Sequence, residues 1–217
     1  LDPRLGYRVG ARMHIVDGAL SNPVVIAGAA LTIGGLAQGL RRLPMEKIPV
    51  AGVLSATFFV ASLIHVPIGP SSVHLIMNGL AGLVLGWAAF PALFVGLLLQ
   101  AVFFGFGGVT VLGVNTVVIA GPAVLAGLVL SSTIRNTSPR GGAFWGAVGG
   151  GGAIALTTAF VAVALALTGD EFLPAAKLVF FAHIPVMVIE ALLTGAAVYL
   201  AKQVKPELFD DLQGALQ

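Results

Sequence analysis

The stretch LIMNGLAGLVLGWAAFPALFVGLLLQAVFF, residues 75–104, carries no charged side chain and decides the class of fold. A helix needs roughly 20 apolar residues to cross about 30 Å of hydrocarbon, so this stretch exceeds the length of one crossing. Its residues are continuously apolar instead of alternating with polar ones, which favours helices over the strands of a membrane barrel. The stretch therefore predicts membrane-spanning helices.

The remainder of the chain has the same character. Hydrophobic residues make up 58% of the 217 residues and charged residues 9%, and the mean hydropathy is +1.02. Soluble domains carry about a quarter charged residues, so we expect an integral membrane protein embedded in the lipid bilayer. The chain has no polar linker, which predicts one domain, and no cysteine, which excludes disulfides and thiolate metal sites. The net charge of +2 is too small to carry information about nucleic acid, and we expect no nucleic-acid partner for a protein of this class.

The apolar stretches predict an all-α, polytopic fold with about seven transmembrane helices and no strand in the membrane. The third and fourth stretches are divided only by Phe90-Pro91, so six spans is the alternative count. The expected spans are 23–40, 48–64, 74–89, 91–106, 116–133, 142–168 and 174–201.

Lysine and arginine in short loops predict the orientation, because such residues collect on the cytoplasmic side. Seven spans place the N-terminus outside, the C-terminus in the cytoplasm, and all of the following residues on the cytoplasmic side: Arg41, Arg42, Lys47, Arg135, Arg140, Lys202 and Lys205. We expect a multi-pass protein of the cytoplasmic (inner) membrane. Its single transmembrane domain covers residues 13–202, and residues 203–217 form a cytoplasmic tail.

Glycines recur at four-residue spacing in several predicted spans. Such faces let helix backbones approach closely in lipid. They serve packing within this chain or docking of another membrane subunit, and the sequence leaves both readings open. The glycines are Gly35 and Gly39, Gly82 and Gly86, and Gly142, Gly146 and Gly150.

Polar groups are costly inside a membrane protein, so the few that occur are candidate functional residues. The loop HVPIGPSSVHL, residues 65–75, holds His65 and His74 on the predicted outer side. Its prolines and glycine predict a stiff, irregular backbone. We expect Ser71 and Ser72 to cap the next helix and to leave His74 in its first turn.

Met13 and His14 predict a metal site if Met13 is the first residue of the mature chain. Its α-amine, the deprotonated amide nitrogen of His14 and the His14 imidazole would then close a five-membered and a six-membered chelate ring. His74 would supply a fourth nitrogen. Four nitrogens in a plane suit Ni(II), Cu(II) or low-spin Co(II). Residues 1–12 are interpreted as a cloning remnant or a misassigned start.

Three further polar residues have alternative roles. Asn115, in the Gly-rich stretch 107–116, either hydrogen-bonds a ligand histidine or caps the fifth span. His183 and Glu190 are seven residues apart and share a helix face, with Pro185 bending the helix between them. For this pair we favour a structural or coupling role over metal ligation, through internal pairing or contact with a partner protein, and an ion pathway is also open.

Enzyme signatures are missing from the chain. It has no His-Glu-x-x-His, no Gly-x-Ser-x-Gly and no phosphate-binding Gly-x4-Gly-Lys-Ser/Thr, so we expect neither catalysis nor ATP hydrolysis by this chain. A metal-dependent membrane hydrolase is the rival from another class, and it would need a base near the histidines, where Asp17 is the one outward carboxylate nearby. A channel is the third option.

Four segments resemble, in order, the CbiM/NikM family, the substrate-capture subunits of energy-coupling-factor importers for cobalt and nickel. The closest resemblance is to CbiM. The segments are MHIVDGAL (13–20), GPSSVHLIMNGLAGLVLG (69–86), QAVFFGFGGVTVLGVNTVVIAGP (100–122) and HIPVMVIEALLTG (183–195).

The resemblance implies that Met13, His14 and His74 bind Co2+ as transported substrate, with Ni2+ as the alternative and no catalytic cofactor. It assigns no ligand role to His65, which would tune affinity as a neighbour. It also implies a membrane-embedded coupling (T) subunit, two cytoplasmic ATPase subunits, a small accessory membrane subunit, and a supply of cobalt to cobalamin biosynthesis. The ligand types do not separate cobalt from nickel.

Overall fold

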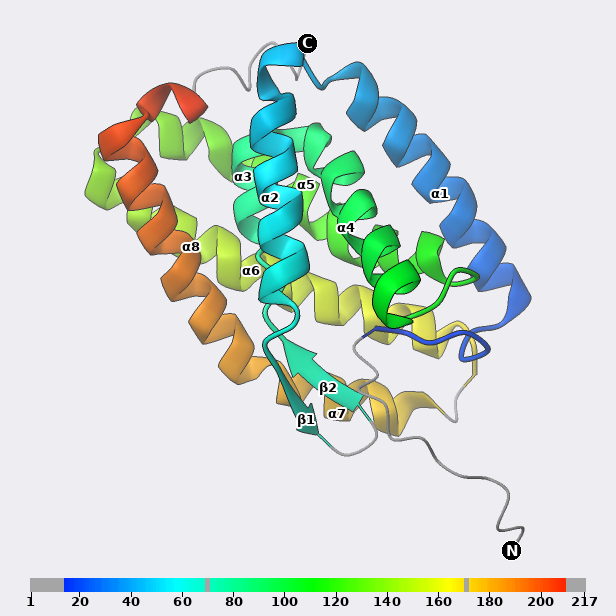
Figure 1. Ribbon diagram of the computed structural model, residues 1–217. Coiled ribbons are helices and arrows are strands. Elements are labelled where there is room, and N and C mark those ends of the chain that lie inside the picture. Colours follow the sequence, from blue (N-terminus) through cyan, green and yellow to red (C-terminus); the bar gives the residue numbers. More distant parts are fainter. Residues whose placement is uncertain (1–13, 69–70, 170–171, 210–217) are drawn as a thin grey trace, which may run out of the picture.

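The protein is a bundle of helices with one small β-hairpin, described by a computed structural model for residues 14–68, 71–169 and 172–209 (Figure 1). The α-helices are α1 (Asn22–Arg41), α2 (Ile48–Ala61), α3 (Asn78–Leu85), α4 (Ala89–Phe104), α5 (Leu112–Asn136), α6 (Pro139–Ala166), α7 (Leu173–Ala182) and α8 (Ile184–Val204). Short 3-10 helices are η1 (Met45–Lys47), η2 (Gly86–Ala88) and η4 (Pro206–Phe209), and the strands are β1 (His65–Ile68) and β2 (Ser71–His74).

Within the described residues, five stretches are long and apolar enough to cross a membrane: Asn22–Arg41, Asn78–Phe104, Leu112–Asn136, Pro139–Ala166 and Ile184–Val204. Many large apolar side chains on their outer faces are exposed, for example Val129 at 70% and Leu192 at 68%. Such faces suit contact with lipid tails. The prediction of an all-helical, polytopic membrane protein is thereby confirmed, although α2, with 14 residues, is shorter than the expected span.

The break between the third and fourth predicted spans lies at η2 and not at Phe90-Pro91. Gly86 ends α3 with φ +56° and ψ −125°, a conformation that glycine adopts without a steric penalty. Pro91 instead lies in the first turn of α4, where its missing N–H has no partner to lose. The proline is therefore compatible with the start of the helix.

The last predicted span, 174–201, is divided into α7 and α8 at His183. Pro185 lies in the first turn of α8, so it begins the second helix and does not bend one continuous helix. The prediction of a bend was placed correctly along the chain, but the structure makes the bend a full break.

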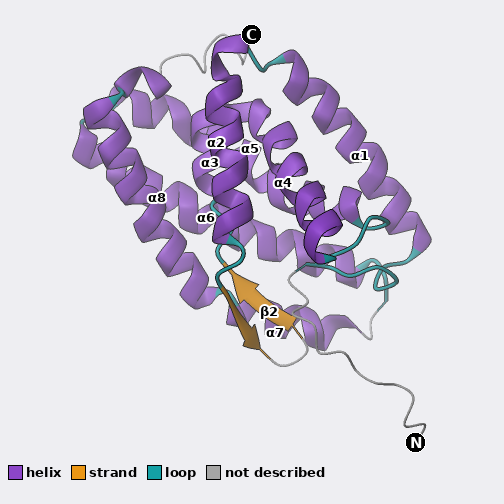
Figure 2. Ribbon diagram, in the orientation of Figure 1, coloured by secondary structure: helices purple, strands orange, loops and turns teal. Residues whose placement is uncertain are grey.

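The loop after α2 is more regular than expected. β1 and β2 pair antiparallel, with His65 opposite His74 and Val66 opposite Val73 (Figure 2). The prediction of a helix cap at Ser71 and Ser72 is wrong, because both lie in β2 and α3 begins four residues after His74. The hairpin and α7 lie at the same end of the molecule.

The repeating glycines pack against neighbouring helices of the same chain. A Cβ on Gly146 would lie 2.8 Å from the Val198 side chain, and one on Gly150 would lie 2.6 Å from the Thr194 Cβ, so α6 and α8 touch through these positions. Gly82 lies against the backbone of Ala123, between α3 and α5. These contacts support the reading of internal packing for these positions.

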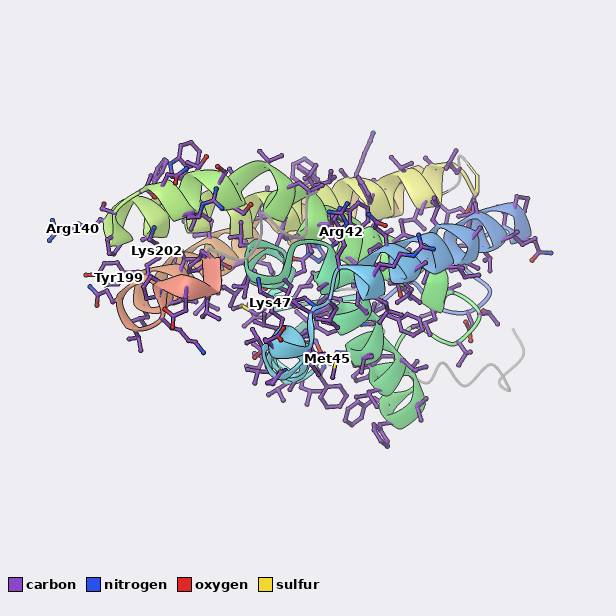
Figure 3. The ribbon with its side chains drawn as sticks, turned by 90° about the horizontal axis from the view of Figure 1, so that it is seen from above. Arg42, Met45, Lys47, Arg140, Tyr199 and Lys202 are labelled. Carbon is purple, nitrogen blue, oxygen red and sulfur yellow. The ribbon has the colours of Figure 1, made fainter. Side chains whose placement is uncertain are left out.

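The loops rich in basic residues lie at the end of the molecule opposite the hairpin. Figure 3 looks onto that end and labels Arg42, Lys47, Arg140 and Lys202 on it. The Lys202 ammonium donates hydrogen bonds to the carbonyl oxygens of Ile134, Arg135 and Thr137, where it caps the carboxyl end of α5. The basic residues thus lie at one end of the molecule, as the prediction of basic loops on one side of the membrane requires. The orientation of that end toward the cytoplasm stays a prediction.

Candidate metal-binding site

The segment that precedes α1 docks onto the glycine-rich loop before α5. The Asp17 amide donates to the Gly107 carbonyl oxygen at 3.0 Å, and Asp17 Oδ1 accepts from the Thr110 amide at 3.1 Å, from the Thr110 hydroxyl and from the Val111 amide at 3.3 Å. Asp17 therefore binds free amide groups at the amino end of α5 from outside that helix.

The glycines of this loop make the close approach possible. Gly107 and Gly108 have φ of +76° and +130°, and a Cβ on Gly108 would overlap the Asp17 carboxylate. A Cβ on Gly107 would lie 2.8 Å from Asn115 Nδ2 and 3.2 Å from the His14 Cβ. Larger residues at these positions would push the segment away from the loop.

Asn115 anchors the same segment in a way that neither sequence-based alternative described. It is buried in the first turn of α5, and its Nδ2 donates to the Ile15 carbonyl oxygen at 2.9 Å. The hydrogen bond of its side chain is thus to backbone and not to an imidazole, and Asn115 lies inside α5 instead of at its cap. Its contact is with the backbone of the residue after His14.

The anchored segment brings His14 next to His74. The two ring centroids are 5.0 Å apart and the ring planes meet at 89°. His74 is 4% exposed at the end of β2, and its Nδ1 donates to the Leu75 carbonyl oxygen at 3.1 Å. Side chains 60 positions apart in the sequence thus form one pair of imidazoles.

A buried glutamine, Gln100, is hydrogen-bonded to His14, one of the two imidazoles of the pair. The His14 Nε2 is 2.8 Å from Gln100 Oε1, and Gln100 Nε2 donates to Ser62 Oγ at 2.5 Å. Gln100, in α4, and Ser62, at the end of α2, are both fully buried. The site therefore reaches from the N-terminal segment to the ends of two helices.

The surroundings favour a neutral His14. Burial lowers the pKa of the His14 imidazole below its ordinary value, because the charged form loses hydration, while the hydrogen bond with Gln100 acts in the opposite direction. A neutral imidazole is the form that binds metals.

His65 lies beside His74 in the hairpin, and Ser72 lies two residues before His74 in β2. His65 faces His74 across the hairpin, and its Nδ1 donates to the Leu63 carbonyl oxygen at 3.0 Å. Directly opposite residues of an antiparallel pair extend from the same face of a sheet. The backbone of Ser72 pairs with Pro67. Met13 lies outside the described residues.

His183 and Glu190 do not bind each other. His183 Nδ1 donates to the Val179 carbonyl oxygen at 2.7 Å, at the junction of α7 and α8. Glu190 is fully buried, and its Oε1 accepts from the Ile76 amide at 2.5 Å and the Met77 amide at 2.8 Å. The carboxyl group replaces a local cap at the amino end of α3, where Met77 has φ +55°. Of the alternatives left open for this pair, the structure does not show internal pairing.

In the part of the chain that the structure describes, no three His, Asp or Glu side chains lie close enough together to hold a metal ion. The two imidazoles have ring nitrogens of the kind that bind metal ions. Backbone groups or water molecules would complete the coordination shell of an ion bound there. The fold and this site define the class: a polytopic helical membrane protein with a small nitrogen-lined site at one end of its helices.

Comparisons with known proteins agree with this class. The family model described as "CbiM: Cobalt uptake substrate-specific transmembrane region" matches residues 14–208. A protein of Haemophilus influenzae whose name assigns it to metal transport is 42% identical over 203 residues, which are 91% of this chain and 97% of that protein. A fused nickel transport protein, NikMN, of Rhodobacter capsulatus is 37% identical over 122 residues, covering 52% of this chain and 35% of that protein.

A solved structure has a similar fold. The crystal structure of a transition metal transporter superposes with a TM-score of 0.70 at 26% sequence identity, covering 88% of this chain and 93% of that one. The chain belongs to the CbiM family, and it is a transmembrane component of cobalt or nickel uptake.

Sequence reasoning missed Gln100, Ser62 and the anchoring role of Asp17. Gln100 is an uncharged polar residue in a predicted span. Burying an unpaired amide in a membrane is costly, so its position alone could have indicated that it has a hydrogen-bond partner. Asp17 was considered only as a possible base, and its hydrogen bonds to a loop about 93 residues away are not visible in the sequence.

Proposed function

We propose that this chain is the substrate-capture subunit of an energy-coupling-factor importer, which binds Co2+ outside the cell and delivers it to the cytoplasm. The ion would be bound by the imidazoles of His14 and His74. The observation that supports this most directly is the 5.0 Å separation of the two rings. Metal–imidazole bonds of about 2 Å bring two ligand nitrogens within about 4 Å of each other, which is compatible with rings whose centroids are 5.0 Å apart.

Two more nitrogens are proposed to come from the start of the segment. A chain beginning at Met13 would offer its α-amine and the amide nitrogen of His14. An amino-terminal extension would convert the amine into an amide, which binds metals poorly. The anchoring of residues 15–17 by Asn115 and the Gly107 loop supports this geometry, because it holds the segment beside His74.

The two imidazoles do not choose between cobalt and nickel. The family model is described by cobalt uptake, and one relative is named a nickel transport protein. The Irving–Williams order gives Ni(II) the higher affinity for a given nitrogen site. Cobalt, serving cobalamin biosynthesis, is our proposal, and nickel is the alternative.

Import against a gradient requires energy that this chain is proposed to receive from partners: a membrane-embedded coupling subunit, two cytoplasmic ATPase subunits and a small accessory membrane subunit. Within this chain, Glu190 is proposed to couple the site to the helices. It lies on α8 and holds the backbone two and three residues after His74, so a movement of α8 would move the His74 segment. His183, where α7 meets α8, is proposed as part of the same coupling, while Ser72 and His65 are proposed neighbours of the ligands.

A hydrolase is disfavoured by the bonding of Asp17. Its Oδ1 accepts three hydrogen bonds from Thr110 and Val111. This is the bonding of a structural anchor and not of a base aligned with metal-bound water.

Titration of the purified protein with Co(II) tests the proposal. Relative to the chain that begins at Met13, we expect His74→Ala and His14→Ala each to weaken binding by at least about 100-fold, because each removes a ligand nitrogen. The 217-residue chain should also bind less tightly than the chain that begins at Met13.

His183→Gln is the matched control, since that imidazole makes a hydrogen bond at the α7–α8 junction and should not touch the ion. Thermal melting of each variant in detergent shows whether the fold is retained. Unchanged Co(II) affinity in a folded His74→Ala protein would contradict the proposal.

A further inference from the structure

Gln100 lies between the proposed ligand His14 and the end of α2. Its Oε1 faces His14 Nε2 at 2.8 Å, and its Nε2 faces Ser62 Oγ at 2.5 Å. The Ser62 hydroxyl in turn donates to the Phe59 carbonyl oxygen at 2.8 Å. Gln100 and Ser62 are fully buried, so bulk water cannot replace these partners.

When the Ser62 hydroxyl donates to the Phe59 carbonyl oxygen, the hydrogen-bond donors of this chain of contacts have one consistent arrangement. A carbonyl oxygen only accepts, so the single Ser62 hydroxyl hydrogen is used toward Phe59. Ser62 Oγ must then accept, and the amide nitrogen of Gln100 must face it. A Gln100 amide turned by 180° would set two acceptors against each other at Ser62.

This arrangement determines which nitrogen of His14 carries hydrogen. Gln100 Oε1 only accepts, so His14 Nε2 must donate to it. A neutral imidazole with hydrogen on Nε2 has its lone pair on Nδ1. A neutral His74 has the opposite form, because its Nδ1 donates to the Leu75 carbonyl oxygen and the lone pair is then on Nε2.

We propose that Gln100, oriented by Ser62, is a positioning residue that fixes His14 in the one tautomer able to chelate the transported ion. Nδ1 is separated from the amide nitrogen of its own residue by three carbon atoms, so both nitrogens close a six-membered ring on one ion. Nε2 lies farther along the ring and cannot close that chelate. The proposal rests on the proposed metal capture for the identity of the ligand.

The test combines a tautomer measurement with Co(II) titration of the chain that begins at Met13. In protein labelled with 15N-histidine, protonated and unprotonated ring nitrogens have well-separated chemical shifts. We expect His14 to be protonated on Nε2 in the metal-free wild type. Gln100→Leu should yield a mixture of both tautomers and bind Co(II) about 10- to 100-fold more weakly, the usual effect of losing a partner of a ligand histidine.

Three variants separate this role from general damage to the fold. Gln100→Glu keeps an acceptor oxygen toward His14, and its second oxygen would accept the Ser62 hydroxyl hydrogen in place of the Phe59 carbonyl oxygen. It should therefore restore the Nε2–H tautomer and most of the affinity. Ser62→Ala lets the Gln100 amide turn and should have an effect between those of the wild type and Gln100→Leu. Gln38→Leu, the same substitution in α1, should change neither quantity.

Two results would overturn the proposal: a wild-type His14 protonated on Nδ1, or a folded Gln100→Leu protein with unchanged tautomer and affinity. A Gln100→Leu protein whose His14 tautomer changes but whose Co(II) affinity does not would also overturn the proposal. The lone pair on His14 Nδ1 would then not be needed to bind the ion. If the wild type binds no Co(II), the proposed function fails, and the ring spectra alone decide whether Gln100 fixes the tautomer.

Discussion

The contact between α6 and α8 and the site around His14 and His74 are held together by different forces. In the first, glycines at positions 146 and 150 let two long helices touch through van der Waals contacts. In the second, the segment that carries His14 is held by hydrogen bonds of the Asp17, Asn115 and Gln100 side chains. We infer that changes in glycine packing act on the whole fold, while changes in the polar anchors act on metal binding alone.

Gly82→Ala should lower the stability of the fold more than any other change in this set, because it places a methyl group in the contact between α3 and α5. The added Cβ would overlap the Ala123 carbonyl oxygen, a backbone group that cannot move away without displacing α5. Overpacking costs about 1–3 kcal/mol and sometimes more. We expect a strongly lowered melting temperature in detergent or no folded protein.

Gly52→Ala is the matched control, since a Cβ there meets nothing within 4 Å inside an apolar helix. It should leave the melting temperature unchanged or slightly raised, as alanine favours helix. Equal melting temperatures for the two variants would remove the assigned role of Gly82.

Glu190→Leu should have the second largest effect, because Glu190 connects the two regions. The substitution leaves the amides of Ile76 and Met77 without their acceptor. A buried unsatisfied group costs roughly 1–3 kcal/mol, so we expect both a lower melting temperature and weaker Co(II) binding. Glu190→Gln keeps an acceptor oxygen and should retain most of both, and equal behaviour of the two variants would argue against these hydrogen bonds.

Gly108→Ala should affect the site and spare the fold. The methyl group would displace Asp17 and loosen the segment that carries His14. We expect about tenfold weaker Co(II) binding, in line with losses caused by partners of metal ligands, at a nearly unchanged melting temperature. Gly105→Ala is the control for a methyl group added at a glycine with positive φ, here +66°, because a Cβ there has no neighbour within 4 Å. The docking role is wrong if both variants bind Co(II) alike.

Asn115→Ala should have the smallest effect of the set. It removes one hydrogen bond to the Ile15 carbonyl oxygen, a loss of about 0.5–1.5 kcal/mol, which corresponds to roughly 2- to 10-fold in Co(II) affinity. Asn136→Ala, at the opposite end of α5, is the control and should bind as the wild type does. A loss as large as that of His74→Ala would mean that Asn115 does more than anchor the backbone.

The sequence predicted the parts of this molecule that depend on composition and residue type. Apolar stretches such as 116–133 had to be helices, because only a helix satisfies its own backbone in lipid. His14 and His74 were predicted to share one metal ion because both fall on the predicted outer side and supply imidazole nitrogens, and the family resemblance implied the same pair. Where each helix breaks was not predictable, since Gly86 and Pro91 are equally good signals and only packing against α1 and α5 selects Gly86.

The partners of the histidines were also beyond the sequence. Gln100 and Ser62 meet because α2 and α4 lie side by side, a contact between residues 38 positions apart. The hairpin β1–β2 was hidden because Pro67 and Pro70 indicate irregular backbone, although Pro67 lies in a strand of a two-stranded sheet, where a proline without a donor N–H is tolerated at an edge.

X-ray absorption at the cobalt edge, on the Co(II)-loaded chain that begins at Met13, tests the imidazole pair most directly. Multiple scattering from imidazole rings counts the histidines bound to the ion. We expect two imidazoles in the wild type and one in a His74→Ala sample loaded at high Co(II) concentration. A wild-type spectrum with fewer than two imidazoles, or one that His74→Ala leaves unchanged, would contradict the assignment of His14 and His74 as joint ligands of one ion.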